Sequence, residues 1–341
     1  MNETKILLTG ATGFIGQELL KRLMDMDNAY EVHVLERYMT KRYSLEQKQD
    51  YITHYASLTD YPAIKNIVHE VKPDYVIHLA AISPVSFSYE HPIEVNEINY
   101  LGSINLAEAC RREVPEFKQY IFAGTSEEYG MNLSAPNVLL TEESSLMPNS
   151  PYAVSKVATD FYLRYMGLAY NFPYTIMRSF NSFGRKDNTH FFIERTITQM
   201  LSQNKVYLGD PTAIRSWLYV DDHVEGYLQA LGNPKAIGEA FNLCTDKAYT
   251  TKETAELIAK LMKFKGKIIW KATPQRPLDA KILYGDNTKV EALLGWKPRY
   301  SLEEGLKKSI KYWKKWKKDA TTTKTRIRDN TKRQAFLPKG I

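Results

Sequence analysis

Tyr152 and Lys156 lie one helical turn apart, so on a helix both side chains would project from the same face. An ammonium group close to a phenol stabilises the phenolate and lowers the pKa of the tyrosine, which can then act as a base near neutral pH. The chain contains 23 tyrosines, so such pairs arise by chance, and Tyr61 with Lys65 is a second example that we interpret as surface. The pair at 152 and 156 therefore indicates catalysis only together with another feature.

A polar turn supplies that other feature. Thr125, Ser126 and Glu127 come just after the apolar, strand-like segment 119–123. In a doubly wound sheet, functional groups gather at the carboxyl ends of the strands. There the Thr125 hydroxyl can bond a substrate oxygen that is being oxidised, and Glu127 can supply a second acid–base group. Without the tyrosine and the lysine, we would interpret this turn as a polar loop with a helix cap.

A glycine-rich turn lies near the start of the chain. Gly10 and Gly13 separate the apolar segment 5–9 from segment 14–26, whose apolar residues have helical spacing, and Gly16 lies in the first turn of that segment. A bound phosphate needs backbone N–H groups aimed at it, a helix N-terminus behind it and no Cβ atom in the way. Glycines at these points allow that approach and the tight turn. The turn predicts a dinucleotide site, with contacts from Gly10, Thr12, Gly13, Phe14, Ile15 and Gly16.

The next predicted strand, 32–35, leads into Glu36 and Arg37. An acid about 20 residues past the glycine turn usually binds the ribose hydroxyls of the cofactor. The Glu36 carboxylate would repel the 2′-phosphate of NADP, whereas Arg37 could receive it. A solvated charge after a strand is the simpler alternative for Glu36. We expect NAD as the cofactor, with NADP less favoured.

The apolar pattern predicts the framework that must position these groups. Strand-like and helix-like segments alternate through the first half of the chain, which is typical of a parallel, doubly wound α/β sheet of the Rossmann type. The second half is less regular and predicts a smaller α/β domain. The main expected strands are 5–9, 32–35, 74–79, 119–123 and 174–178, and the main expected helices of this half are 14–26, 61–71, 92–113 and 152–171.

Composition limits the class of protein. The 341 residues carry a net charge of +7, but residues 307–341 alone hold 13 basic residues and two acids, so the rest of the chain is mildly acidic. We therefore expect no nucleic-acid groove, and a basic extension over 319–341. Only Cys110 and Cys244 occur, which argues against disulfides and metal clusters. No apolar stretch approaches the about 18 residues of a membrane span, and we expect a cytoplasmic protein.

Taken together, these motifs resemble one family. The glycine turn, the strand end 78–81, the Thr-Ser-Glu turn and the Tyr152/Lys156 pair look like the extended short-chain dehydrogenase/reductase family of NAD-dependent nucleotide-sugar epimerases and dehydratases. The resemblance covers about residues 5–316. It continues, in the family's order, through Arg178–Gly184, Arg215–Asp222, Arg276–Asp279 and Leu293–Pro298.

The resemblance implies a nucleotide-diphosphate sugar as substrate. In such enzymes the tyrosine takes the proton of the sugar C4 hydroxyl while NAD takes the C4 hydride, and the lysine orients the nicotinamide ribose. These roles fall on Tyr152 and Lys156, with Thr125 at the C4 oxygen. Further cofactor contacts would be Leu79, Ala80 and Ala81, and substrate contacts would be Ser83, Ser126, Asn181, Arg185, Arg215 and Arg276. For Ser83 a solvated loop is an equally good interpretation.

The resemblance also narrows the reaction. The Thr-Ser-Glu turn resembles that of 4,6-dehydratases, notably the GDP-mannose type, in which the glutamate removes the C5 proton, water leaves from C6 and the hydride returns to C6. The same turn occurs in UDP-glucuronate decarboxylases, while simple 4-epimerases usually carry Ser-Ser or Ser-Ala there. The Gly-Phe-Ile-Gly turn and Glu36 depart from the GDP-mannose pattern. We predict a 4,6-dehydratase, with the decarboxylase and the 4-epimerase as alternatives, and a non-catalytic NAD-binding protein as a different class.

The resemblance finally implies an organisation. We expect an NAD-binding domain over 1–180, to which parts of 215–245 return, and a nucleotide-sugar-binding domain over 181–318. Segments 92–113 and 152–171 match the helices with which family members pair into a four-helix interface, so we predict a homodimer. We expect no metal, and we interpret His78 as a packed residue beside the cofactor.

Overall fold

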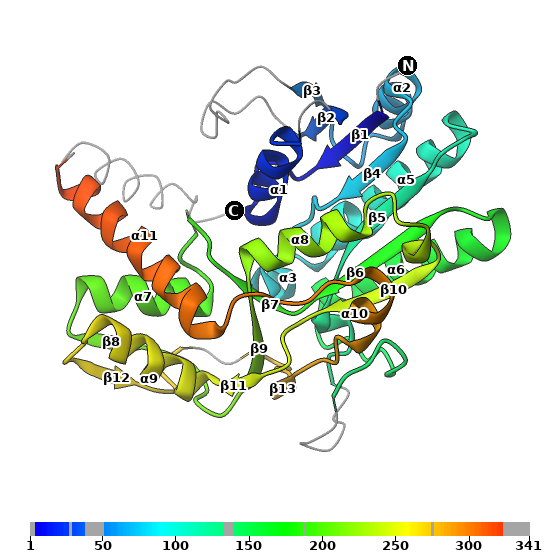
Figure 1. Ribbon diagram of the computed structural model, residues 1–341. Helices are drawn as coiled ribbons and strands as arrows, with labels where there is room; N and C mark the ends of the chain where they lie inside the picture. The colour runs from blue at the N-terminus through cyan, green and yellow to red at the C-terminus, as the bar shows by residue number, and fades with distance from the viewer. Residues whose placement is uncertain are drawn as a thin grey trace, which may run out of the picture.

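The computed structural model describes residues 4–26, 29–37, 51–131, 139–186, 188–273 and 276–322. A seven-stranded sheet dominates the larger lobe, with strand order β10-β6-β5-β4-β1-β2-β3 (Figure 1). Every neighbouring pair in it is parallel, which confirms the predicted doubly wound sheet. Its strands are β1 (Thr4–Thr9), β2 (Tyr30–Glu36), β3 (Tyr51–Tyr55), β4 (Tyr75–His78), β5 (Gln119–Thr125), β6 (Tyr174–Ser179) and β10 (Glu239–Leu243).

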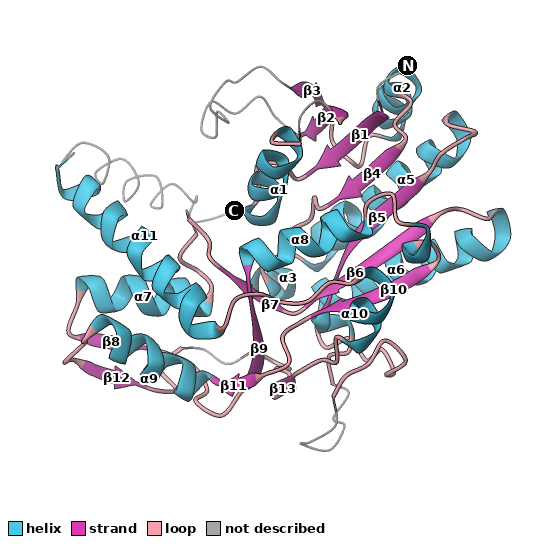
Figure 2. Cartoon of the chain, in the orientation of Figure 1, coloured by secondary structure: helices cyan, strands magenta, loops and turns pink. Residues whose placement is uncertain are grey.

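Helices cover both faces of this sheet (Figure 2). Helices α1 (Phe14–Met24), α8 (Val220–Ala230) and α10 (Thr288–Leu294) pack on one face, and α2 (Tyr61–Val71), α5 (Gly102–Glu113) and α6 (Pro151–Tyr170) pack on the other. Successive side chains of a strand point to opposite faces, so Ile6 and Leu8 join the first apolar cluster and Leu7 joins the second. Burial on both faces explains why the central strands are continuous apolar runs.

Local signals set the starts of the helices that carry function. Ser150 caps α6 by accepting a hydrogen bond from the Ala153 N–H at 3.1 Å, and Pro151 occupies the first turn, where its missing N–H costs nothing. The expected helix 92–113 is α4 (Pro92–Asn96), a π-helical turn over Glu97–Leu101, and α5, joined without a break. A short helix, α3 (Val85–Glu90), precedes it.

The smaller lobe has its own sheets and core. Strands β11 (Ala248–Thr250), β9 (Ile214–Tyr219) and β13 (Ile282–Leu283) form one sheet, in which β7 (Asn181–Phe183) also pairs with β9. Strands β8 (Lys205–Tyr207) and β12 (Lys267–Ile269) form a second. Helices α7 (Phe192–Ser202), α9 (Thr251–Met262) and α11 (Leu302–Thr322) enclose a core that contains Trp217, Leu306 and Trp313.

The two lobes interleave along the chain. From segment 215–245, β10 joins the large sheet and α8 packs on it, whereas β9 belongs to the smaller lobe. Helix α10, from later in the chain, also packs on the large sheet, next to Trp296, whose Nε1 donates to the Asp222 carbonyl at 2.9 Å. The chain therefore crosses between the lobes several times. Segments distant in sequence meet at the junction of the two lobes, which we call the cleft.

The C-terminal helix α11 projects from the smaller lobe (Figure 1) and extends to Thr322. The expected extension over 319–341 thus begins inside this helix, and 323–341 lie outside the described residues. Among the helices that the structure describes, none has the length and apolar character needed to cross a membrane.

Candidate active site

The glycine turn forms a cradle at the end of β1. Gly10 has a φ of +74°, and a Cβ atom there would lie 2.7 Å from the Ala80 nitrogen, so only glycine fits. Gly13 directly precedes α1, and Gly16 packs against the backbone of Gly10 and Ala11. The N–H groups of the first turn of α1 carry no side-chain cap. This bare helix start, approached closely by backbone, fits the diphosphate of a dinucleotide.

The strand end 79–81 is fixed beside that cradle. The Thr9 hydroxyl accepts the Ala80 N–H at 3.1 Å and lies 2.7 Å from His78 Nδ1, while His78 Nε2 lies 2.8 Å from the Ser103 hydroxyl. Burial, with a smaller effect of the Lys156 charge, lowers the pKa of His78 to about 3. His78 is thus a neutral, hydrogen-bonded core residue, as predicted. The described residues contain no group of three or more metal-ligating side chains.

Glu36 is the last residue of β2, and the half-buried side chain has its pKa raised by burial. Arg37 follows in an exposed bend. The carboxylate position at the end of the second strand is the one expected to receive ribose hydroxyls. Ser83 lies in an exposed loop before α3.

Strand β5 and helix α6 bring the predicted acid–base groups together. β5 ends at Thr125, a 3₁₀ turn covers Ser126–Glu128, and Tyr152 lies in the first turn of α6. The side chains of Thr125 and Tyr152 are hydrogen-bonded. Lys156 donates from Nζ to the Ala123 carbonyl at 2.8 Å. All of these side chains are buried, so the cleft places a phenol, a hydroxyl and an ammonium in one dry environment.

Burial changes the titration of the pair. It raises the pKa of Tyr152, and the negative charges of Glu127 and Glu128 act in the same direction, whereas the hydrogen bond from Thr125 lowers it. Burial also lowers the pKa of Lys156 to about 8. The sequence predicted a tyrosine of lowered pKa, and this is wrong for the protein as described, because desolvation of the buried phenolate is the largest effect on the pKa of Tyr152 and raises it.

Glu127 points into the same cleft. Its carboxyl group is buried, and its Oε2 atom has no hydrogen-bond partner among the described residues. Burial raises its pKa, and the charges of Arg215 and Arg276 oppose that effect. A buried carboxyl that lacks a partner is costly for the fold, and a raised pKa suits a group that exchanges protons near neutral pH.

Two arginines from the smaller lobe face Glu127. Arg215, on β9, is 8% exposed and donates to the carbonyls of Ala280 and Lys281 at 2.8 and 3.2 Å. Its guanidinium lies 3.6 Å from Asp279, which is also 3.6 Å from the guanidinium of Arg276. The structure therefore gathers both predicted arginines around one aspartate at the cleft, where planar guanidinium groups can bind phosphate oxygens.

Three other polar groups complete the cleft. Asn181, which was predicted, has a buried Oδ1 without a partner in the described chain, and so does Asn149, which was not. Tyr89, on α3, was also missed. Its hydroxyl lies 2.8 Å from the Asn149 carbonyl and 2.9 Å from the Leu278 carbonyl. No sequence motif marks Tyr89 or Asn149; only the meeting of α3, α6 and segment 276–279 reveals them.

A buried ion network lies beneath the catalytic turn and was also missed. Glu128 accepts the Thr125 N–H at 2.8 Å and an Arg178 Nε–H at 3.1 Å. Asp160 accepts from Arg178 Nη2 at 2.8 Å. Arg178 also donates to Tyr129 at 3.0 Å. Burial and the neighbouring Asp160 raise the pKa of Glu128 to about 8, so two acids share one arginine. Ser126, predicted as a substrate contact, is 2% exposed in this turn.

Arg185 lies against the glycine turn. Its guanidinium carbon is 4.3 Å from the ring centre of Phe14 and 3.5 Å from that of Phe191. Its backbone N–H donates to Glu194 at 3.0 Å. The sequence grouped Arg185 with the arginines that would bind the sugar nucleotide; in the structure its guanidinium lies over Phe14, in the cofactor turn, and over Phe191, in the smaller lobe.

The chain is similar to several known proteins over most of its length. Residues 7–309 match the model of the family described as GDP-mannose 4,6 dehydratase. The dTDP-glucose 4,6-dehydratase of Haemophilus influenzae is 27% identical, over 90% of this chain and 97% of that protein. The structure of a UDP-glucose 4-epimerase with UDP-glucose from Thermotoga maritima superposes with a TM-score of 0.83 at 30% identity, over 92% and 99% of the two chains. A UDP-glucuronic acid 4-epimerase of Bacillus cereus, in complex with UDP-glucuronic acid and NAD, gives 0.81 at 25% identity, over 92% and 100%.

Proposed function

The chain belongs to the GDP-mannose 4,6 dehydratase family, and from this premise we propose that it is a nucleotide-sugar 4,6-dehydratase that works with tightly bound NAD. It converts a nucleoside-diphosphate hexose into the corresponding 4-keto-6-deoxy sugar nucleotide. The observation that carries the proposal is Glu127, a buried carboxyl beside Tyr152 with an oxygen left without a partner in the described cleft. A simple 4-epimerase needs no such second acid.

The first half-reaction is an oxidation at C4. The chemistry that bound NAD would supply is acceptance of the hydride from C4 and its later return to C6. Tyr152 takes the proton of the C4 hydroxyl, and Thr125, hydrogen-bonded to Tyr152, holds the same oxygen. Lys156, fixed by the Ala123 carbonyl, provides positive charge that stabilises the phenolate.

The second half-reaction is an elimination. A ketone at C4 makes the C5 proton acidic, and the Glu127 carboxylate removes it. Glu127 passes that proton to the C6 hydroxyl, which leaves as water, so the C5–H and C6–O bonds break while a C5–C6 double bond forms. Return of the hydride to C6 and of a proton to C5 completes the product. The raised pKa of Glu127 brings its proton affinity closer to that of a general base at neutral pH.

The diphosphate of the substrate binds to the smaller lobe. Arg215 and Arg276 offer two guanidinium groups around Asp279. Charge-assisted hydrogen bonds from arginine to phosphate are among the strong ones. The substrate class is therefore a nucleotide-diphosphate sugar, and the base and sugar are to be found by assay.

The test is a product assay across a panel of nucleoside-diphosphate hexoses and uronates. We expect a 4-keto-6-deoxy product from at least one hexose, with one solvent deuteron incorporated at C5. Glu127→Gln should abolish elimination but still allow C4 oxidation, seen as the absorbance of reduced nicotinamide. Glu116→Gln, at an exposed position, is the matched control and should behave as wild type.

Other outcomes assign other reactions. A pentose with released carbon dioxide from a uronate would identify a decarboxylase, and full turnover by Glu127→Gln would remove the role given to this residue. A 4-epimerase is the second candidate, since the solved epimerase at 30% identity covers nearly the whole chain. It predicts a C4 epimer without loss of water. Failure of every sugar nucleotide to reduce bound NAD would instead support a non-catalytic NAD-binding protein.

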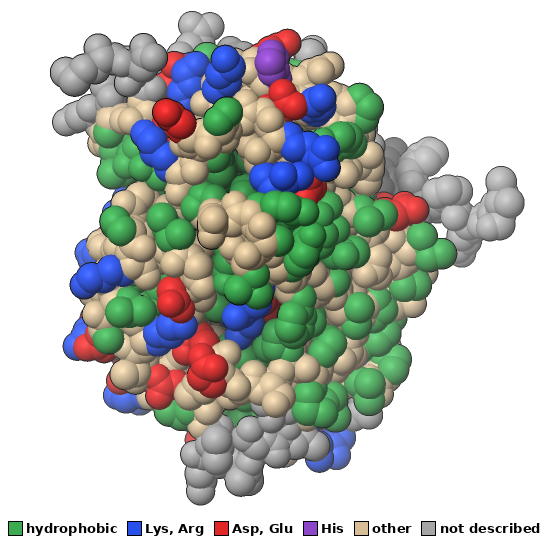
Figure 3. Space-filling view, turned by 90° about the vertical axis from the view of Figure 1, so that its right-hand side faces the viewer, with side chains coloured by type: hydrophobic (Ala, Val, Ile, Leu, Met, Phe, Trp, Pro, Cys, Tyr) green, Lys and Arg blue, Asp and Glu red, His purple; other side chains and the backbone are tan. Residues whose placement is uncertain are grey.

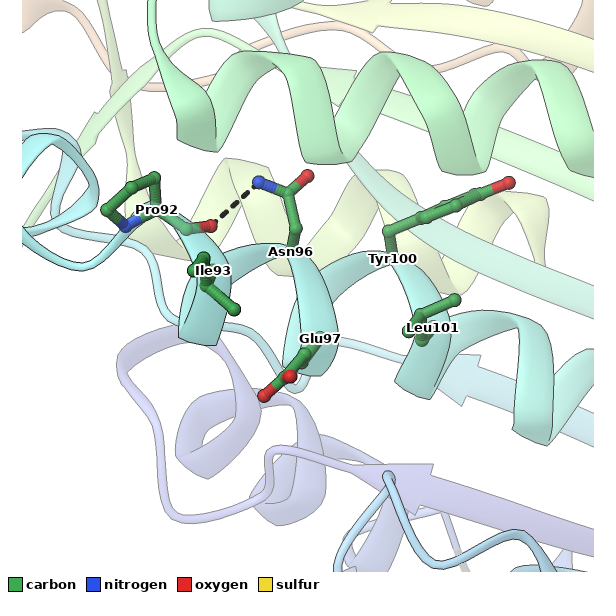
Figure 4. Close-up of a pocket in the computed structure, with 6 residues that line it drawn as sticks. All are labelled: Pro92, Ile93, Asn96, Glu97, Tyr100 and Leu101. Carbon is green, nitrogen blue, oxygen red and sulfur yellow. Dashed lines mark hydrogen bonds between the residues drawn. The ribbon is translucent and has the colours of Figure 1, made fainter.

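We also propose that the protein is a homodimer. Helix α6 exposes an apolar stripe at helical spacing, with Val154, Phe161, Tyr165 and Leu168 exposed by 46%, 58%, 48% and 90%. Beside it, the segment 92–101 lines a shallow hollow in which the ring of Tyr100 extends alongside α6 (Figure 4). Hydrophobic side chains gather over this side of the molecule (Figure 3).

The occupant we assign to this stripe is a second copy of the chain. A two-fold axis would bring the same stripe of each chain together, and two helices from each copy would form a four-helix contact. The stripe carries no charge along its length, so it suits its own copy. Leu168→Glu should give a monomer in light scattering, with Ile237→Glu, exposed elsewhere, as control. A wild-type monomer, or a Leu168→Glu dimer, would contradict the proposal.

A further inference from the structure

The segment 184–186 joins the smaller lobe to the cofactor turn. Gly184 has a φ of +111°, and a Cβ atom there would lie 2.9 Å from Val220 Cγ1, so the chain can bend sharply here only with glycine. Directly after this bend, Arg185 extends over Phe14 and Lys186 forms an ion pair with Glu18. Phe14 and Glu18 lie one turn apart on α1. Two successive basic side chains thus contact the helix whose start forms the diphosphate cradle.

The other side of the segment is anchored in the smaller lobe. The Glu194 carboxylate, on α7, accepts the N–H groups of both Gly184 and Arg185, at 2.8 and 3.0 Å. The hydroxyl of Tyr312, on α11, donates to the Lys186 carbonyl at 2.7 Å. These bonds fix the backbone of the segment, so its side chains are held in place rather than left to find α1 by chance.

The Arg185 guanidinium is well positioned. It is enclosed between the rings of Phe14 and Phe191, at 4.3 and 3.5 Å from their centres, and donates to the Ser182 carbonyl. Its Nη1 also forms an ion pair with Glu194 Oε2 at 3.7 Å. Its side chain is only 11% exposed. A planar, permanently charged group stacked between two rings keeps its orientation and loses little entropy on binding an anion.

From these contacts we infer that Arg185 is a cofactor-retaining residue, which closes the glycine turn from the smaller lobe and adds a positive charge beside the diphosphate of NAD. This assigns Arg185 to the cofactor rather than to the sugar nucleotide. It holds for any of the reactions considered above, since each returns the hydride to the sugar and needs NAD to stay bound between turnovers.

The experiment measures bound NAD without any sugar substrate. Wild type, Arg185→Gln, Arg185→Lys and the control Arg195→Gln, an exposed position on α7, are purified in parallel and dialysed against NAD-free buffer. The NAD released on denaturation is then quantified, and its dissociation rate is followed by transfer to an NAD-consuming enzyme. We expect Arg185→Gln to lose NAD about tenfold faster or more, as removal of a charge-assisted contact implies.

The variants separate the two assignments of this arginine. Arg185→Lys keeps the charge but loses the planar stacking, so its NAD release should lie between wild type and Arg185→Gln, while Arg195→Gln should match wild type. NAD retention by Arg185→Gln equal to wild type, together with a raised KM for the sugar nucleotide, would overturn the inference and return Arg185 to the substrate. Equal NAD loss from Arg195→Gln would overturn it as well. Circular dichroism of each variant, with NAD added back, establishes that release is measured on folded protein. Glu18→Gln breaks the ion pair between Glu18 and Lys186, which is the neighbouring contact between segment 184–186 and α1.

Discussion

Tyr89 links the two sides of the substrate cleft through one hydroxyl group. That hydroxyl lies within hydrogen-bond distance of the carbonyl of Asn149, just before α6, and of Leu278, in the segment that carries Arg276 and Asp279. Tyr89→Phe removes the hydroxyl and keeps the ring. Segment 276–279 then loses its link to the start of the helix that holds Tyr152.

The size of the effect follows from the bonds lost. A hydrogen bond of this kind contributes about 0.5–1.5 kcal/mol net, and a single hydroxyl proton shared between two carbonyls cannot make two full bonds. We therefore take about 1 kcal/mol as the free energy needed to order the segment when substrate binds. At 1.4 kcal/mol per factor of ten, this corresponds to a KM raised about fivefold. Because the Tyr89 hydroxyl bonds to the backbone of Asn149 and Leu278 and not to the acid–base groups, kcat should change less than about twofold.

The assay is steady-state kinetics with the sugar nucleotide identified from the product panel. Tyr284→Phe is the matched control, because its hydroxyl also donates to a backbone carbonyl, that of Asp246, at 2.8 Å. A Tyr89→Phe variant with unchanged KM and lowered kcat would refute the reasoning, because it would place Tyr89 in the chemical step. An equal rise in KM for Tyr284→Phe would refute it too, since the effect would then be general to lost hydroxyl bonds.

Three further perturbations test separate parts of the structure. Gly10→Ala should abolish NAD binding and lower the free energy of unfolding by about 1–3 kcal/mol, because the residue has a positive φ and a Cβ atom there would lie 2.7 Å from the Ala80 nitrogen. NAD titration and urea unfolding measure the two effects, and normal NAD binding would contradict the prediction. Lys156→Met should lower kcat about 100-fold or more. It should not lower the free energy of unfolding at pH 7, since the pKa of Lys156, lowered to about 8, means that burial penalises the charged form. A large loss of stability in urea would count against this prediction. His78 has a pKa lowered to about 3, so below about pH 6.5 the imidazole is protonated in the unfolded chain but stays neutral in the folded chain. For this group the free energy of unfolding therefore decreases by about 1.4 kcal/mol for each unit by which the pH is lowered. His78→Asn should remove that slope between pH 6.5 and 4 in urea unfolding, and an unchanged slope would contradict the lowered pKa.

Much of the framework could be predicted from the sequence because its signals are local. The strand-turn-helix around Gly10 carries its own pattern, as do the continuous apolar strands, and both are observed. Thr125 was predicted at the carboxyl end of a strand, where functional groups gather, and Tyr152 was singled out by its spacing from Lys156. The family pattern named both Arg215 and Arg276 as substrate contacts, and in the structure both guanidinium groups lie 3.6 Å from Asp279.

The contacts that the sequence did not show join distant segments. Tyr89 and Leu278 are 189 residues apart, and Arg185 reaches Phe14 across the two lobes. Nothing near Tyr89 or Arg185 in the sequence specifies such a partner. The prediction of a lowered pKa for Tyr152 was wrong for a related reason. The spacing of Tyr152 and Lys156 predicts only that they lie on one face of a helix, whereas the pKa depends on how completely the surrounding chain excludes water.

Glu127 and Glu128 show how adjacent, chemically identical residues acquire different roles. They lie in a 3₁₀ turn, in which successive side chains are rotated by about 120°, so one faces the cleft and the other faces the core. Glu127 is left near Arg215 and Tyr152. Glu128 instead binds Arg178 and the Thr125 N–H.

Room for Glu128 comes from Gly124, because a Cβ atom there would lie 2.8 Å from Glu128 Oε1. The backbone of Thr125 is thus held by an ion network that faces the core, and its hydroxyl remains directed at Tyr152. Buried ion pairs are weak sources of stability but fix geometry when every member is bonded. The proton-transfer groups of the cleft are therefore positioned from behind, by a glutamate, an arginine and an aspartate that face the core.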